Sequence, residues 1–132
     1  MNIIFKSPLT PTSHYDKKLF DILKDMNNMA PLMPEQVINI VADVDNFAFT
    51  IQGMGNVALR VSQRVPNSLI QLVPVGKVPF PFILNIHIQA DGEKSLCCFE
   101  INAELNPLMA MMAKRPLQNL VEMMAQRVNR LS

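Results

Sequence analysis

The chain has 132 residues, of which 49% are hydrophobic and 17% charged, and its formal net charge is +1. This length and composition predict one globular domain over residues 1–132, and the near-neutral charge argues against nucleic acid as a partner. No apolar run approaches the roughly 20 residues of a membrane span, and the N-terminal residues do not resemble a signal peptide. We therefore expect a cytoplasmic protein without integral membrane association.

The first quarter of the chain predicts a short strand and a helix. The strand covers residues 3–7 and ends at the prolines that follow. The helix is predicted over residues 13–25, with Thr12 or Ser13 as its N-cap. Residues 25–34 are rich in methionine and proline, so they predict a helical turn and a loop.

Beyond Pro34 the hydrophobic period changes from 3.6 to 2, which indicates strands. The predicted strands cover residues 37–44, 47–51, 57–62, 69–73, 82–89 and 95–105. Residues 74–81 contain three prolines and should be irregular, whereas Asp91-Gly92 is typical of a tight hairpin. Alternation with one polar side indicates an antiparallel sheet that faces water on one side.

The last quarter predicts one long amphipathic helix, with Asn106 as the N-cap and Pro107 at the first helical position. Apolar residues recur on one face at steps of three and four, namely Leu117, Leu120, Val121, Met124, Val128 and Leu131. Pro116 interrupts the pattern, and an interior proline costs about 3 kcal/mol. The helix should bend there or divide into residues 107–114 and 116–131. Either the bend follows the curvature of the sheet, or the first piece is a mobile rim beside a cavity mouth.

This order of elements predicts an α+β fold in which a curved antiparallel sheet wraps around the C-terminal helix. Apolar strand residues should project toward the helix and form either a packed core or a pocket for a hydrophobic ligand. The candidate ligand-binding residues are Met29, Met33, Phe49, Ile51, Leu59, Ile70, Leu72, Leu84, Phe99, Met112, Leu117, Val121 and Met124. We find no inward polar residue among them that would make a ligand specific.

Catalytic and metal sites have little support in the sequence. His14 and His87 are the only histidines, and neither has cysteines or carboxylates at the spacing of a zinc site, so we expect no metal or other cofactor. Ser13, His14 and Asp16 lie too close together on one helix to face each other as a catalytic triad.

The remaining reactive residues have simple structural interpretations. Cys97 points inward by strand parity and is best explained as a small core residue. Cys98 is its neighbour and points to the other face, so a bridge between the two is not expected, which fits a reducing compartment. Asp43 and Asp45 are best explained by a solvated turn. No catalytic residue is therefore assigned.

The chain resembles the START-like superfamily, and in particular short bacterial members described as polyketide cyclase-like or lipid-transport-like. The residues that carry the resemblance are Asp25-Met26-Asn27-Asn28-Met29, Val78-Pro79-Phe80-Pro81-Phe82, Ala103-Glu104-Leu105-Asn106-Pro107-Leu108 and Lys114-Arg115-Pro116-Leu117-Gln118. The resemblance covers nearly the whole chain and implies the helix-grip fold, with seven antiparallel strands around the C-terminal helix and a cavity between them. It implies no fixed active-site residues.

Two functions remain open from the sequence. The first is non-catalytic binding of a small hydrophobic ligand, lipid- or polyketide-like, between sheet and helix. The alternative is a protein-interaction module without a ligand, in which Met29, Leu32, Met33, Met109 and Met111 form an exposed apolar patch. A cyclase or dehydratase follows only from the family resemblance and would need a polar group inside the cavity. The oligomeric state stays open.

Overall fold

The computed structural model describes residues 1–131. The strands are β1 (Asn2–Lys6), β2 (Thr10–Thr12), β3 (Val37–Ala42), β4 (Asn46–Ile51), β5 (Gly55–Val65), β6 (Leu69–Pro74), β7 (Phe82–Asp91) and β8 (Lys94–Glu104). The helices are α1 (Asp16–Leu23) and α2 (Pro107–Arg127), with three short 3₁₀ turns, η1 (Met26–Asn28), η2 (Ala30–Leu32) and η3 (Val128–Arg130).

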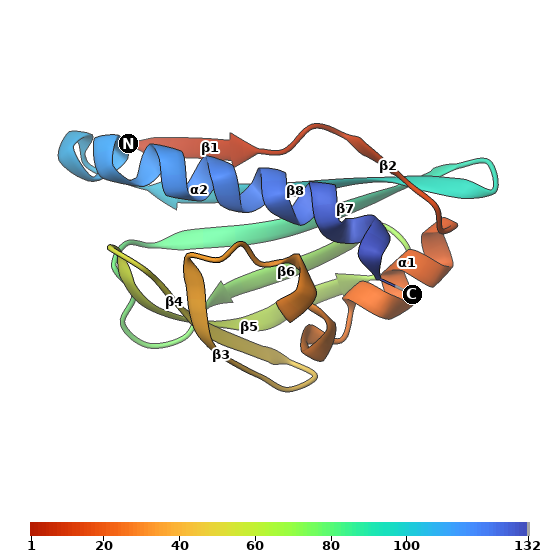
Figure 1. The fold of residues 1–132 in the computed structure, drawn as a ribbon, viewed down its shortest axis with the longest axis horizontal. Coiled ribbons are helices and arrows are strands. Elements are labelled where there is room, and N and C mark those ends of the chain that lie inside the picture. The colour runs from red at the N-terminus through yellow and green to blue at the C-terminus, as the bar shows by residue number, and fades with distance from the viewer. Residues whose placement is uncertain (132) are drawn as a thin grey trace.

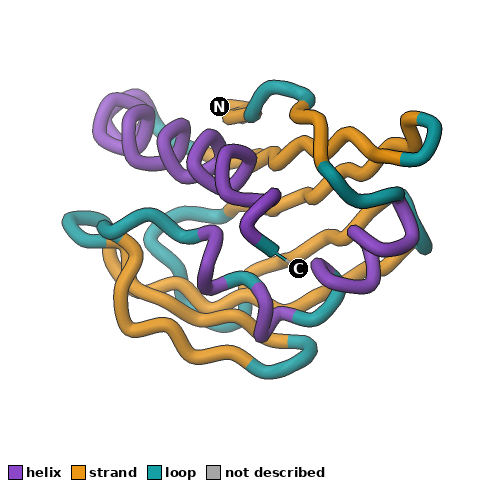
Figure 2. The backbone as a smooth tube through the Cα atoms, turned by 45° about the vertical axis from the view of Figure 1, so that its right-hand side comes forward, coloured by secondary structure: helices purple, strands orange, loops and turns teal. Residues whose placement is uncertain are grey.

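The strands form one antiparallel sheet in the order β1-β8-β7-β6-β5-β4-β3, and β2 also pairs with β8. Consecutive strands from β3 to β8 are joined as a meander, whereas β1 crosses over to the far side of β8. Helix α2 runs along the concave side of this sheet, and the short turns η1 and η2 lie on the same side (Figures 1 and 2). The predicted α+β helix-grip architecture is confirmed, with eight strands instead of about seven.

The core lies between the sheet and the helices because the strands alternate as the sequence predicts. In β4, Phe47, Phe49 and Ile51 are buried and the residues between them are not. In β7, Phe82, Leu84, Ile86 and Ile88 alternate in the same way. A single apolar cluster joins these strands to the buried faces of α1 and α2.

Helix α2 starts as predicted but does not divide. The Asn106 side chain accepts a hydrogen bond from the Met109 N–H at 2.8 Å, and Pro107 follows at the first helical position. The helix then continues through Pro116 to Arg127, so the alternative of two separate pieces is wrong. The packing of Ala113 and Leu117, both fully buried on either side of the proline, offsets the missing hydrogen bond.

The segment before α1 differs from the prediction. Helix α1 begins at Asp16, and its N-cap position, Tyr15, has no side-chain capping bond, so the predicted cap at Thr12 or Ser13 is wrong. Thr12 is instead part of β2, an extra strand, and its hydroxyl lies 2.6 Å from that of Ser95 on β8. This side-chain bond and the strand pairing use the residues that would otherwise have started the helix.

Near the C-terminus the chain returns to this same segment. Asn129 accepts a hydrogen bond from the Ser13 N–H at 2.9 Å and donates one to the Pro11 carbonyl at 3.2 Å. The His14 ring nitrogen Nε2 lies 2.8 Å from the Leu131 carbonyl. The end of α2 is therefore fixed beside β2 and α1, where Figure 1 shows the C-terminus.

Candidate functional site

The predicted ligand-binding residues come together on the inner side of the sheet. Apart from Met112, all of them belong to the buried apolar cluster between sheet and α2. Met112 is 55% exposed, so its predicted inward position is wrong. It precedes Leu117 by five residues, and five helical steps turn a side chain by about 140°. Met112 therefore points to solvent while Leu117 points to the sheet.

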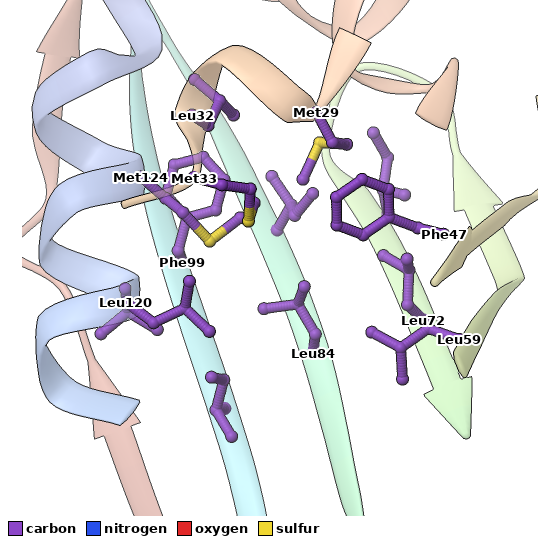
Figure 3. Close-up of a cluster of buried hydrophobic side chains, with 14 of the residues drawn as sticks. Met29, Leu32, Met33, Phe47, Leu59, Leu72, Leu84, Phe99, Leu120 and Met124 are labelled. Carbon is purple, nitrogen blue, oxygen red and sulfur yellow. The ribbon is translucent and has the colours of Figure 1, made fainter. Parts of the chain in front are cut away.

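Figure 3 shows how the interior is built. Met29 and Met33 come from the η1–η2 segment. In this view Met33 lies beside Met124 of α2 and Phe99 of β8, and Met29 lies beside Phe47 of β4. Met29 and Met124 are fully buried and Met33 is 7% exposed. The η1–η2 segment thus packs over one side of the apolar cluster between α2 and the sheet.

Several interior residues were not among the sequence candidates, and Phe47, Leu120 and Leu32 are examples. Phe47 is 1% exposed and lies in register with Leu59 on the next strand. Its alternation with Phe49 and Ile51 is enough to predict that it points inward. It is absent from the candidates because it directly follows a predicted turn. Leu120 belongs to the predicted helix stripe. Leu32 is fully buried, which contradicts the expected exposed patch of Met29, Leu32 and Met33.

The interior offers almost no polar chemistry. The buried polar side chains of residues 1–131 are Ser7, Thr12 and Ser95. Ser95 shares the inward parity of β8, but its hydroxyl is engaged by Thr12 and donates to the His14 carbonyl at 2.8 Å. Cys97 is the thiol of this face, and burial raises its pKa far above the ordinary range. It stays protonated and acts as a small apolar residue.

A polar groove opens where α2 passes the ends of β3 and β4. Its volume is about 550 Å³, and its lining includes Gln36, Gln52, Arg115, Pro116 and Asn119. Gln36 and Gln52 are held together because the Gln52 N–H donates to the Gln36 carbonyl at 2.9 Å. The groove therefore presents a guanidinium and several amides beside the proline of α2. It contains no paired acid and base at hydrogen-bond distance.

Arg127, in the last turn of α2, contacts the segment that follows η2. Its guanidinium donates to the Met33 carbonyl, and Nη2 lies 3.4 Å from a carboxylate oxygen of Glu35. The Arg127 side chain is 14% exposed, whereas that of Glu35 is 90% exposed. The buried hydrogen bond to Met33, more than the exposed ion pair, therefore holds the η2 segment against α2.

The catalytic candidates weighed in the sequence have structural partners instead. Ser13 binds Asn129, and the ring of His14 lies against Leu131. Asp43 accepts the backbone N–H groups of Asp45 and Asn46 at 2.9 and 2.8 Å. The hydrogen bond from the Asn46 side chain, together with these two backbone bonds, lowers the pKa of the Asp43 carboxyl. The carboxylate is part of a tight turn.

Cys98 differs from the expected water-facing position. It is 3% exposed, and its thiol lies 3.4 Å from the Ser7 carbonyl. The chain leaving β1 covers it on the outer side of the sheet. Both cysteines are free.

Residues 1–131 contain no group of three or more histidine, cysteine or acidic side chains placed to hold a metal ion. Within the same residues, no helix has both the length and the apolar character needed to cross a membrane.

Comparison with known proteins shows the fold. No family model and no curated protein sequence matches the chain. Among solved structures, norcoclaurine synthase from Thalictrum flavum is similar with a TM-score of 0.74 at 9% identity, over 98% of this chain and 92% of that chain. A START superfamily protein from Mycobacterium smegmatis has a TM-score of 0.68 at 13% identity, over 98% and 97%. A Deinococcus radiodurans protein has 0.63 at 12%, over 98% and 95%. The chain therefore has the START-like helix-grip fold.

Proposed function

We propose that the protein binds a small hydrophobic ligand, lipid- or polyketide-like, between the sheet and α2, and that it does so without catalysis. The observation that supports this most directly is the composition of the buried cluster between these elements. It consists of aliphatic, aromatic and methionine side chains from the strands, from α2 and from the η1–η2 segment. Ligand sites for apolar molecules have this lining.

The buried methionines favour an adaptable interior over a rigid one. Met26, Met29, Met33 and Met124 are all 7% exposed or less. Methionine is unbranched and polarizable, so it fills irregular space and changes rotamer at low cost. A ligand could enter by displacing these side chains, while the branched residues of the sheet keep the walls in place.

The same interior argues against an enzyme. General acid–base or nucleophilic catalysis needs a titratable group within reach of the substrate, and the pKa of the inward Cys97 is raised by burial. The fold itself does not decide this point, because a norcoclaurine synthase structure with the same fold is described in complex with dopamine and hydroxybenzaldehyde. The choice between an enzyme and a binding protein therefore rests on the side chains of this chain.

We further propose that the groove beside Pro116 is the entrance. Pro116 cannot donate to the Met112 carbonyl, so α2 is least constrained there. The groove is lined by polar side chains, among them Arg115, Gln36 and Gln52. They would remain hydrated while the apolar ligand passes inward. The two free, buried cysteines support a reducing compartment such as the cytoplasm.

Native mass spectrometry tests the proposal with a panel of four probes: lauric acid, a lysophospholipid, farnesol and 2-naphthol. We expect a 1:1 complex with at least one probe. Leu84→Phe should abolish it, because Leu84 is 5% exposed and points inward. The matched control Ile83→Phe adds the same bulk one residue away on the outer face and should leave it intact. Absence of any complex, or equal loss in both variants, would contradict the proposal.

A further inference from the structure

The edge of the sheet at β1 carries backbone groups that point away from the protein's own strands. Met1 and Leu105 exchange two backbone hydrogen bonds, and the Ser7 N–H donates to the Phe99 carbonyl at 2.9 Å. Pairs of this kind recur at every second residue of an antiparallel ladder. Ile3 and Phe5 therefore bond to β8, whereas the N–H and C=O groups of Asn2, Ile4 and Lys6 point outward.

One of these outward groups already has a partner from α2. Gln118 Nε2 donates to the Lys6 carbonyl at 3.1 Å, which confirms the parity. Asn2 and Ile4 belong to β1, the strand at one edge of the sheet (Figure 1). Unpaired edge groups of this kind are a template for an additional strand.

An apolar groove runs beside this edge. It has a volume of about 550 Å³ and lies between β1 and the first three turns of α2, lined by Met1, Ile3, Ile4, Phe5, Pro107, Ala110, Met111, Lys114 and Gln118. Of the lining residues, Ile4 is 55% exposed and Met111 80%. Large apolar side chains gathered on one exposed surface mark an interaction site.

The other two strands with an open edge, β3 and β2, have features that hinder pairing with a further strand. Strand β3 has a bulge between Ile38 and Val41, where Asn39 has a positive φ of 55°. Strand β2 contains Pro11, whose carbonyl is occupied by Asn129. Bulges and prolines are the devices by which proteins protect edges. Strand β1 keeps an unbroken register over all five of its residues.

We propose that a second copy of this chain occupies the β1 edge, with the two β1 strands antiparallel about a twofold axis at Ile4. This interface is separate from the proposed ligand space. In this register Ile4 pairs with the partner's Ile4, and Asn2 pairs with the partner's Lys6 and vice versa. The two Ile4 residues can exchange two backbone hydrogen bonds. Each Asn2–Lys6 pair can add the bond from the Lys6 N–H to the Asn2 carbonyl, because Gln118 already donates to the Lys6 carbonyl. The exposed isoleucines then cover each other, which is the self-complementarity that a twofold interface requires.

Charge on the outer face fits the same arrangement. Lys6 lies opposite Glu100 and Asn2 lies opposite Glu104 on β8. In the dimer, four side chains would form one row across the joined sheet: Glu100, Lys6, the partner's Asn2 and the partner's Glu104. Lys6 stands about 10 Å from the partner's Glu104 along the backbone spacing, which the two side chains can span. The Glu104 side chain is 60% exposed although it contacts the N-terminal ammonium. No like charges face each other in the register.

Sedimentation velocity of the full chain from about 5 to 500 µM tests this, a range suited to a small interface. We expect a dimer whose dissociation constant rises at least tenfold in Ile4→Pro, which removes an outward N–H and leaves the ladder to β8 in place. Val41→Lys is the control, since Val41 is 71% exposed on the opposite edge, and it should dimerise normally. A wild-type monomer throughout the range, or equal loss in Ile4→Pro and Val41→Lys, would overturn the proposal.

A charge swap decides the matter if Ile4→Pro fails to fold, as judged by circular dichroism. Lys6→Glu should weaken the dimer because it leaves three carboxylates and no cation in that row. Adding Glu104→Lys should restore dimerisation at least fivefold relative to Lys6→Glu. Failure of this rescue would overturn the proposed register. A monomer whose β1 amide NMR signals shift on adding one of the apolar probes would assign the groove to a small ligand instead of a second copy.

Discussion

The two halves of α2 share one helix but have different surroundings. After Pro116, Leu117, Val121 and Met124 are fully buried against the sheet. Before it, Leu108, Met111 and Met112 are 68%, 80% and 55% exposed. The second half is held by the apolar interior and by Arg127, whereas the first half lies beside the β1 edge. Similar apolar residues thus face the buried interior in one half and solvent in the other.

The first prediction measures this contrast directly. Leu117→Ala should lower the free energy of unfolding by about 2–5 kcal/mol, because it leaves a cavity at a fully buried site. Met112→Ala should change the free energy by less than about 0.5 kcal/mol, since the side chain is mainly in water. Urea denaturation followed by circular dichroism measures both. Equal losses would contradict the difference in burial between the two halves of α2.

The second prediction concerns the residue that separates the halves. Pro116→Ala restores an N–H that can donate to the Met112 carbonyl, so it should raise the free energy of unfolding by about 1–2 kcal/mol. If the groove at Pro116 is the entrance, the variant should also release bound probe more slowly. Unchanged release in stopped-flow displacement, in a variant that is more stable, would exclude the entrance while leaving the ligand site untouched.

The third prediction addresses the anchor at the far end. Arg127→Met keeps an unbranched apolar stem but removes the hydrogen bond to the Met33 carbonyl, which should cost about 1–3 kcal/mol. Hydrogen exchange should increase mainly in the η1–η2 segment. Arg130→Met, on the exposed side of the next turn, is the matched control and should leave exchange in that segment unchanged. Faster exchange in both variants would argue against a specific anchor.

The fourth prediction tests the start of the helix. Asn106→Ala removes the cap to the Met109 N–H and should cost about 1 kcal/mol. Because the first half makes few buried contacts, the loss should appear as local fraying of residues 107–112 in hydrogen exchange. Asn106→Ser should recover most of the stability. An Asn106→Ser variant as unstable as Asn106→Ala would show that the cap contributes nothing.

The smallest expected effect is a pH dependence next to the β1 edge. Glu100 accepts a hydrogen bond from His87 at 2.9 Å, and this bond is the main cause that lowers the pKa of the Glu100 carboxyl. The stabilisation is present above the ordinary glutamate pKa and is lost as the pH falls through the lowered folded-state value. Wild type should therefore lose up to about 1 kcal/mol more than Glu100→Gln between neutral pH and acid. Parallel stability curves would contradict this.

Sequence patterns predicted the sheet and α2 well because alternation and helical periodicity reflect burial directly. The strand alternation at Phe49 and Ile51 and the cap at Asn106 are examples, and both are present in the structure. What the sequence could not supply were contacts between distant segments. The pairing of Thr12 with Ser95 adds β2 and displaces the start of α1.

The errors at the candidate site have the same origin. Leu32 and Met33 lie between Pro31 and Pro34 in a segment without periodicity, so only the packing in the structure shows that they are buried. Met112 was placed inward because it is apolar, although its helical phase differs from that of Leu117. Composition suggested the lining residues, while the phase of the helix decides which of them can reach a ligand.

The proposed ligand space is tested most directly by NMR of methionine methyl groups labelled with carbon-13, since methionines occur in both environments. The probes are lauric acid, the lysophospholipid, farnesol and 2-naphthol. We predict that at least one probe shifts the methyl signals of Met29, Met33 and Met124, while those of Met111 and Met112 stay in place. Shifts confined to Met111 and Met112, or no shift with any probe, would contradict a ligand between the sheet and α2.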